Sequence, residues 1–199
     1  MSSKKRGLIY LFTGNGKGKT SAALGIMVRA LINGWRVGWV SWYKEERWGI
    51  SEHHLSKILT KEALERLTFL PMGKGFFLQE TSKEPGEVKT VKVQKATIVD
   101  TKLPEEHKEA ARTALQKAAE LLENVDLLIL DEVCNAVHDG LLTDKEVVRL
   151  LQKITVQHIV LTGRNATSAL ISSSDLVSDL HKVKHPFDQG NMAVKGLDF

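Results

Sequence analysis

An apolar run that breaks into a glycine-rich loop and then into a helix is the feature that most constrains this chain. Residues 8–20 read L-I-Y-L-F-T-G-N-G-K-G-K-T. This order predicts a strand, a phosphate-binding loop and a helix, because glycines let backbone N–H groups turn toward phosphate oxygens and the positive end of the helix attracts them. Lys19 would reach the outer phosphates, and the Thr20 hydroxyl could hold Mg²⁺. The stretch predicts binding of a nucleoside triphosphate.

The glycines of this loop differ by one position from the general P-loop pattern, G-x-x-x-x-G-K-[ST]. That pattern places its first glycine where this chain has Thr13, and the glycine comes one residue later, at Gly14. Gly16 and Gly18 complete the loop. The alternative is a chance turn rich in glycine and lysine, and the agreement between the motif and its strand-to-helix context argues against it.

A second informative strand ends in two carboxylates. Four aliphatic residues, 127–130, lead directly into Asp131 and Glu132. This is the pattern expected of a central strand that delivers acids to a metal beside a P-loop. Asp131 would reach Mg²⁺ directly or through water, whereas Glu132 could be a second metal ligand or, in a hydrolase, could orient an attacking water.

The rest of the chain alternates between helical and strand patterns, which predicts an α/β fold. We expect a P-loop NTPase-like (RecA-like), mostly parallel sheet with helices on both faces. The expected strands are 8–12, 36–42, 67–71, 127–131, 157–162 and 176–184, and the expected helices are 20–33, 51–66, 104–124, 143–153 and 167–174. Residues 80–102, rich in Lys and Glu with a Pro85-Gly86 turn, predict an inserted hairpin or a mobile excursion.

Composition limits the remaining possibilities. A length of 199 residues suits a single domain over 1–199, and no apolar stretch is long enough to cross a bilayer. The single cysteine, Cys134, cannot form an internal disulfide, so we expect a reducing compartment, the cytoplasm. The formal charge of +4 permits an anionic partner, but a polyphosphate ligand explains it as easily as nucleic acid does.

Residues that follow the strands are candidates for the walls of the site, because ligands of open parallel sheets bind at the carboxyl ends of the strands. Trp42, Tyr43, Lys44 and Arg47 come at or just after one strand. Arg164 follows another, and its guanidinium suits an anionic phosphate tail.

Three large apolar residues, Phe76, Phe77 and Leu78, follow a glycine-containing loop. A surface loop is normally polar at such positions. We therefore expect an apolar group to cover them.

Four motifs together carry a resemblance to a known family. They are T-G-N-G-K-G-K-T-S-A-A-L-G at 13–25, L-D-E at 130–132, L-T-G-R at 161–164, and the ending V-K-H-P-F-D-Q-G…G-L-D-F at 183–199. The chain resembles the P-loop corrinoid adenosyltransferases, also called cob(I)alamin adenosyltransferases. The match covers most of the chain, and that family has the same shifted glycine in its loop.

The resemblance implies transfer of the 5′-deoxyadenosyl group of ATP to the reduced cobalt of a corrinoid, with release of tripolyphosphate. It implies ATP as co-substrate, Mg²⁺, a corrinoid substrate, a homodimer, and a reductant or reductase for cobalt. Lys19, Phe76 and Leu78 would act in catalysis, and Thr20, Asp131 and Glu132 would hold or surround the metal. The nucleotide-binding residues would be Gly14, Asn15, Gly16, Lys17, Gly18, Lys19, Thr20, Ser21, Arg29 and Arg164.

The chain departs from the family pattern at three places: Leu78, the insertion over residues 80–102, and an amino-terminal segment too short to form the family's usual arm over the active site. In that family a G-F-x-W segment lies under the corrin ring and keeps the lower axial ligand off cobalt. Gly75 and Phe76 match it, but Leu78 stands where the family has tryptophan. We expect the leucine to exclude water less completely, because it buries less area and cannot stack on the ring.

The alternative function is a RecA-like ATPase that acts on nucleic acid or a regulatory ATP-binding protein. In that hypothesis Glu132 is a hydrolytic base, and residues 42–48 form a base-stacking patch with Lys44 and Arg47. The weak basic bias and the carboxyl-terminal motif argue against it.

Overall fold

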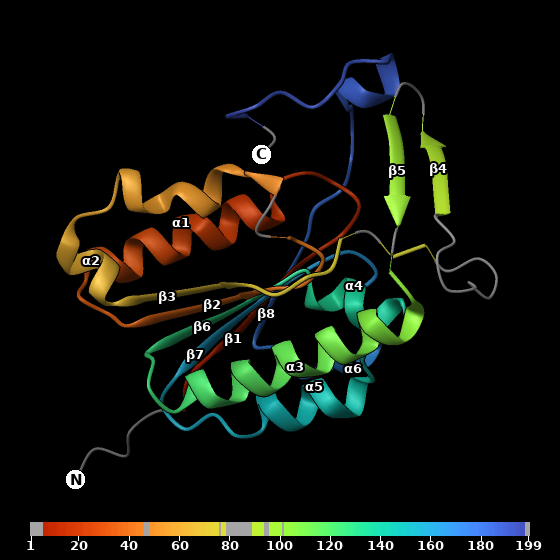
Figure 1. Cartoon of the computed structure of the whole chain (residues 1–199). Coiled ribbons are helices and arrows are strands. Elements are labelled where there is room, and N and C mark those ends of the chain that lie inside the picture. Colours follow the sequence, from red (N-terminus) through yellow and green to blue (C-terminus); the bar gives the residue numbers. More distant parts are fainter. Residues whose placement is uncertain are drawn as a thin grey trace, which may run out of the picture.

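The computed structural model describes residues 6–45, 48–75, 77–78, 89–93, 96–100 and 102–197. Within them, six strands form one parallel sheet in the order β3-β2-β6-β7-β1-β8 (Figure 1). These strands are β1 Ile9–Thr13, β2 Val37–Ser41, β3 Leu67–Pro71, β6 Leu127–Asp131, β7 His158–Thr162 and β8 Leu176–Asp179. A separate antiparallel hairpin joins β4 Lys89–Val93 to β5 Ala96–Asp100.

Helices cover both faces of the sheet, as predicted (Figure 1). α1 Lys19–Ile32 and α2 Lys61–Glu65 lie on one side, and α3 Pro104–Leu122, α5 Asp144–Leu151 and α6 Ser168–Ser172 lie on the other. The remaining helices are α4 Val133–His138 and two 3₁₀ helices, η2 Ser51–Lys57 and η3 Pro186–Gln189. No described helix is long and apolar enough to cross a membrane.

The core consists of two apolar clusters separated by the sheet. Alternate residues of a strand point to opposite faces, so Ile129 packs in the cluster on the α1 side while Leu128 and Leu130 pack in the cluster that contains α3 and α5. All five residues of β2 and of β6 are buried. Burial on both faces explains why these central strands are continuous apolar runs.

Two predicted elements are wrong in detail. Residues 51–66 are not one helix, because the chain breaks between η2 and α2, and the Thr60 side chain accepts a hydrogen bond from the Ala63 N–H to start the second helix. The last strand ends at Asp179 instead of residue 184. Beyond it the backbone turns to the glycine loop, where the Gly16 N–H donates to the Leu180 carbonyl at 2.6 Å.

The predicted insertion is described only in part. The hairpin over β4 and β5 agrees with the hairpin alternative for residues 80–102. Residues 80–88, 94–95 and 101 lie outside the described residues. α4 was not predicted at all, although it begins immediately after the acidic pair.

Candidate nucleotide and metal site

A cavity of about 710 Å³ lies where the glycine loop meets residues that follow β2, β6 and β7. Because all six strands are parallel, the loops after them emerge at one edge of the sheet. The cavity's lining includes the loop and residues distant from it in sequence: Asn15, Gly16, Lys17, Gly18, Lys19, Thr20, Ser21, Lys44, Ile50, Glu52, Glu132, Arg164, Lys182, His185, Asp188 and Ala193.

The shifted glycine has a structural reason. Thr13 is still a residue of β1, paired with Asp179 of β8, so the loop begins at Gly14. Gly14 has φ +97°, and a Cβ there would lie 2.2 Å from Asp179 Oδ1 and 2.4 Å from the Leu180 carbonyl oxygen. A left-handed backbone and this close approach both require glycine.

Lys19 begins α1 and lies against the loop. Its Nζ donates to the carbonyls of Gly14 and Gly16, at 2.8 and 2.7 Å. Burial lowers the pKa of Lys19, an effect that Glu132 partly offsets. The ammonium is therefore held at the loop by backbone carbonyls, a position suited to bound phosphate oxygens.

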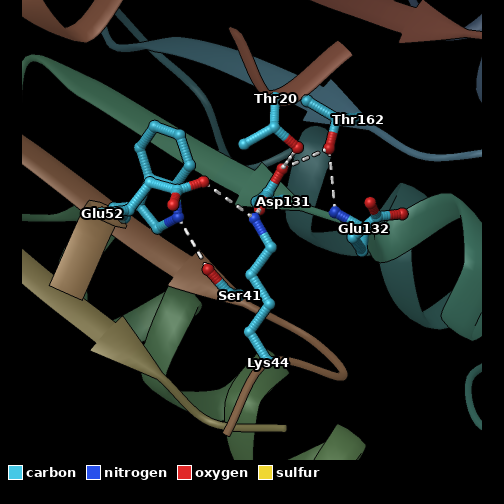
Figure 2. Close-up of polar contacts among 8 residues, drawn as sticks. Thr20, Ser41, Lys44, Glu52, Asp131, Glu132 and Thr162 are labelled. Carbon is cyan, nitrogen blue, oxygen red and sulfur yellow. Dashed lines mark hydrogen bonds and ion pairs between the residues drawn. The ribbon is translucent and has the colours of Figure 1, made fainter. Parts of the chain in front are cut away.

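Asp131 is fully buried and organises the polar side chains at the end of β6 (Figure 2). Its Oδ1 accepts hydrogen bonds from the Thr20 and Thr162 hydroxyls at 3.0 and 2.7 Å. Its Oδ2 accepts from Lys44 Nζ at 2.7 Å. The carboxylate thus has three donors and connects β6, β7, α1 and the segment after β2.

Glu132 differs from Asp131 in conformation and in partners. It has φ +65° and caps α4, and its backbone N–H donates to Thr162 Oγ1 at 2.8 Å (Figure 2). No hydrogen bond joins its carboxylate to the described residues, and it lines the cavity. Burial, together with the nearby Asp131, raises the pKa of Glu132. Burial and the nearby charge disfavour the ionised form of this carboxylate, so a cation bound beside it would stabilise that form.

Lys44 is a second cation in the cavity, and sequence reasoning did place it there. Burial alone would lower the pKa of Lys44, but the charge and hydrogen bond of Asp131 raise it. Glu52, from η2, lies 3.5 Å from the same Nζ through its Oε1 (Figure 2). Glu52 was not predicted as a site residue, since no motif marks it.

Two other predicted wall residues do not line the cavity. Trp42 is buried, and its Nε1 donates to the Ala111 carbonyl at 3.2 Å. The Tyr43 hydroxyl donates to Asp139 Oδ2 at 2.6 Å. A buried Trp42 cannot stack on a base, so this part of the nucleic-acid hypothesis is wrong. Arg47 lies outside the described residues.

The other predicted arginines have different positions. Arg164 lines the cavity, and its backbone N–H donates to Asn135 Oδ1 at 2.6 Å. Arg29 is exposed and does not line the cavity. It follows the start of α1 by ten residues, or about 15 Å at the rise of a helix.

The carboxyl-terminal segment also contributes unpredicted residues. Lys182, His185 and Asp188 line the cavity, and the Lys182 N–H donates to Asn15 Oδ1 at 3.0 Å. A histidine before a proline is typical of a structural turn. These residues are recognised as a wall of the cavity only in the structure, where the chain returns to the glycine loop.

The apolar loop is described only at Phe77 and Leu78, and Phe76 lies outside the described residues. Phe77 packs against His107, with ring centroids 5.1 Å apart. The Leu78 N–H donates to Asp100 Oδ2 at 3.2 Å, and the side chain is half-buried. Leu78 does not line the phosphate cavity.

The parallel sheet, the glycine loop with its lysine, and the paired carboxylates define a P-loop nucleotide-binding protein of the α/β class. The model of one family, described as ATP:corrinoid adenosyltransferase BtuR/CobO/CobP, matches residues 5–199. The chain belongs to this family, and its substrates are therefore ATP and a corrinoid. It is an adenosyltransferase, as the resemblance in the sequence implied.

Curated relatives agree with the family. The corrinoid adenosyltransferase of Escherichia coli (strain K12) is 33% identical over 198 residues, covering 98% of this chain and 87% of that protein. That of Pseudomonas aeruginosa is 30% identical, covering 98% and 85%. The corrinoid adenosyltransferase CobA of Salmonella typhimurium is 31% identical, covering 100% and 88%.

One solved structure, of the RadB recombinase, is similar with a TM-score of 0.49. The match has 14% sequence identity and covers 90% of this chain and 77% of that one. This likeness is too weak to bear on function.

Proposed function

We propose that the cavity beside the glycine loop is where the adenosyl group of ATP is transferred to corrinoid cobalt. The observation that carries the proposal is that Lys19, Thr20 and Glu132 line one cavity although they come from two distant motifs. The glycine loop and Lys19 would hold the triphosphate, and Arg164 would add a further cation at the same edge.

The side chains present fit a magnesium ion. Mg²⁺ in such sites is held by one or two protein oxygens together with substrate phosphates. Thr20 and Glu132 offer these oxygens, while Asp131 is occupied by its three donors. Within the described parts of the chain, no group of three or more His, Cys, Asp or Glu side chains could hold a metal by itself. Bound Mg²⁺ would supply charge neutralisation of the phosphates.

The reaction requires little covalent chemistry from the protein. Reduced cobalt of the corrinoid is the nucleophile; it forms a bond to C5′ of ATP while the C5′–O bond breaks and tripolyphosphate leaves. The protein must then position the two substrates and stabilise the charge on the leaving phosphates. Lys19, with its loop, is suited to that second task.

The location of the corrin ring is a further proposal. We place it against the apolar loop, with Phe76 and Leu78 as its floor, and this rests on the match of Gly75 and Phe76 to the family motif. A homodimer and a reductase or reductant for cobalt are proposed on the same family basis. A cytoplasmic location is proposed from the single cysteine, and a single domain over 1–199 from the length of the chain. Arg29 as a nucleotide-binding residue also stays a proposal.

The phosphate product tests the assignment. The protein is incubated with MgATP and a chemically reduced corrinoid, and the products are separated by anion exchange. Tripolyphosphate formed in proportion to the adenosylated corrinoid is the expected result. ADP and phosphate alone would instead indicate the hydrolytic alternative, with Glu132 as base.

A further inference from the structure

The ammonium of Lys44 lies between two carboxylates at the edge of the phosphate cavity. Its Nζ is 2.7 Å from Asp131 Oδ2 and 3.5 Å from Glu52 Oε1 (Figure 2). The side chains of Lys44 and Glu52 keep only 15% and 13% of their exposure, and that of Asp131 keeps none. Solvent and salt screen charges at such depth only weakly, so the three groups act strongly on one another.

The backbone before Lys44 is fixed in an unusual conformation. Tyr43 has φ +65°, which is uncommon for a residue other than glycine and persists where the surrounding structure imposes it. The Gly73 N–H donates to the Lys44 carbonyl and the Gly75 N–H to the Tyr43 carbonyl, each at 3.1 Å. These bonds, with that of the Tyr43 hydroxyl to Asp139, hold Lys44 at the cavity.

Lys44 also determines what Asp131 can do. A carboxylate has about four lone-pair positions, and Asp131 uses three of them for Thr20, Thr162 and Lys44. The Thr20 hydroxyl donates its single hydrogen to Asp131, which leaves its oxygen lone pairs for a cation. Loss of Lys44 would leave one oxygen of a buried carboxylate without its donor, and Asp131 could then turn away from Thr20 or compete for the cation.

Glu52 is placed to hold Lys44 from the opposite side. Its Oε1 faces Lys44 Nζ, and its Oε2 is buried without a hydrogen-bond partner among the described residues. Among the described residues, Lys44 is the cation that an ion pair joins to Glu52, and removal of either partner would leave a buried charge uncompensated.

We propose that Lys44 and Glu52 are positioning residues of the transfer site: Glu52 fixes Lys44, Lys44 fixes Asp131, and Asp131 directs the Thr20 hydroxyl toward the metal of MgATP. This inference rests on the proposed role of Thr20 and Glu132 as metal ligands. It assigns the function of two residues that the general P-loop pattern does not include.

The affinity of the protein for ATP with and without Mg²⁺ tests the role of Lys44. Calorimetry compares the wild type with Lys44→Met and Lys44→Arg. In Lys44→Met, the increase in ATP affinity that Mg²⁺ provides should fall by about tenfold or more, which is the usual effect of removing a residue that orients a metal ligand. The affinity for metal-free ATP should change little. Lys44→Arg, which keeps the charge, should lose less. An unchanged Mg²⁺ gain in folded Lys44→Met would overturn the proposal.

Lys117→Met is the matched control. Lys117 also forms a 2.7 Å ion pair, with Glu120, but on the exposed surface of α3. The increase in ATP affinity that Mg²⁺ provides should be the same in Lys117→Met as in the wild type. Circular dichroism and thermal melts check folding, and if Lys44→Met does not fold, Lys44→Arg and Glu52→Gln decide the question.

A double-mutant cycle tests Glu52. Glu52→Gln should reduce the Mg²⁺ gain in the same direction as Lys44→Met but by less, and the double variant should be no worse than Lys44→Met alone, because Glu52 acts through Lys44. Additive losses would show that Glu52 acts independently. If Mg²⁺ does not increase the affinity of the wild type for ATP, the metal assignment of Thr20 and Glu132 fails. If Mg²⁺ increases the affinity of the wild type and of Lys44→Met equally, the metal assignment stands and only the positioning role of Lys44 and Glu52 fails.

Discussion

Individual side chains at the carboxyl end of the sheet have different roles in binding a charged substrate. Lys19 is held on the glycine loop, Asp131 accepts from three donors, and the Glu132 carboxylate has no hydrogen bond to the described residues. Asp131 and Glu132 are adjacent but therefore differ in role: the Asp131 carboxylate binds donors of the protein, and the Glu132 carboxylate is available to a cation. The left-handed backbone of Glu132 explains the difference, because it turns this residue out of the strand direction that Asp131 follows.

Lys19→Ala should weaken ATP binding by at least about tenfold, because it removes the cation that the loop presents to the outer phosphates. Calorimetric titration with MgATP measures this. Lys61→Ala is a suitable control, since Lys61 also occupies the first position of a helix, α2, but does not line the cavity. ATP affinity equal to that of the wild type would refute the role of Lys19.

Glu132→Gln should lower Mg²⁺-dependent adenosylation by about 10- to 100-fold and should also reduce the contribution of Mg²⁺ to ATP binding. The amide keeps the shape of the side chain but is a poorer ligand for a hard cation. Rates of adenosylated corrinoid formation across a range of Mg²⁺ concentrations measure the effect. A variant that binds MgATP and transfers at the normal rate would contradict the metal role, and one that accumulates a trapped ATP complex would favour hydrolysis.

At the scale of elements, short segments after the strands determine the shape of the cavity. The segment after β8 packs on the glycine loop, and the segment after β3 packs on the residues that follow β2. These contacts are backbone to backbone, so they depend on small residues and on well-placed strand ends. Asp175→Asn tests how β8, the strand that leads into the first segment, is attached to the sheet, and Gly73→Ala tests the second contact directly.

Asp175 attaches the edge strand β8 to β1. Its Oδ2 accepts from the Ile9 N–H at 2.8 Å, and Arg6 forms an ion pair with it at 3.1 Å. The Ile9 hydrogen bond, and then Arg6, lower the pKa of Asp175. A lowered folded-state pKa adds stability above the unfolded pKa, about 3.9, and this stability is lost as the pH falls through the folded value.

Asp175→Asn should therefore lower the melting temperature by about 2–4 °C at neutral pH, which corresponds to about 1 kcal/mol, because the amide loses the charge but keeps an oxygen that can accept a hydrogen bond. The difference from the wild type should shrink as the pH falls below about 4. Thermal melts across pH measure it, with Glu109→Gln on the exposed face of α3 as control. A difference that stays constant down to acid pH would argue against the charged form of Asp175 as its source.

Gly73→Ala should separate the segment after β3 from the residues after β2. A Cβ at Gly73 would lie 2.2 Å from the Tyr43 carbonyl carbon, whereas one at Gly25 in α1 would meet nothing within 4 Å. We expect Gly73→Ala to destabilise the fold by about 1–3 kcal/mol, and Gly25→Ala to be neutral or to stabilise it by up to about 1 kcal/mol. Urea unfolding midpoints compare the two, and equal midpoints would rule out the close packing at Gly73.

For the whole molecule, the family implies a second copy of the chain. We expect a homodimer, because the resemblance is to a family that forms one. Multi-angle light scattering at micromolar concentration should give twice the mass of the chain. A single-chain mass at that concentration would refute the dimer.

The sequence by itself determined the parts of the molecule that local patterns encode. The glycine loop, the aliphatic strand before Asp131 and Glu132, and the alternation of helix and strand predicted the P-loop α/β fold, because periodicity and turn residues act over a few neighbouring positions. The motifs also identified the family that the match over residues 5–199 confirms. Arg164 was found because residues after parallel strands share one edge.

Only the tertiary structure decided which distant residues meet. The ion pair of Lys44 with Asp131 joins residues 87 positions apart, and the approach of Leu180 to the glycine loop depends on β8 lying beside β1. The order of the strands depends on how whole faces of the sheet and helices pack together, so no local sequence pattern predicts it. Glu52 reaches the cavity from η2, which is separate from α2, although propensity along residues 51–66 favours one helix; the contacts of the fold override that propensity.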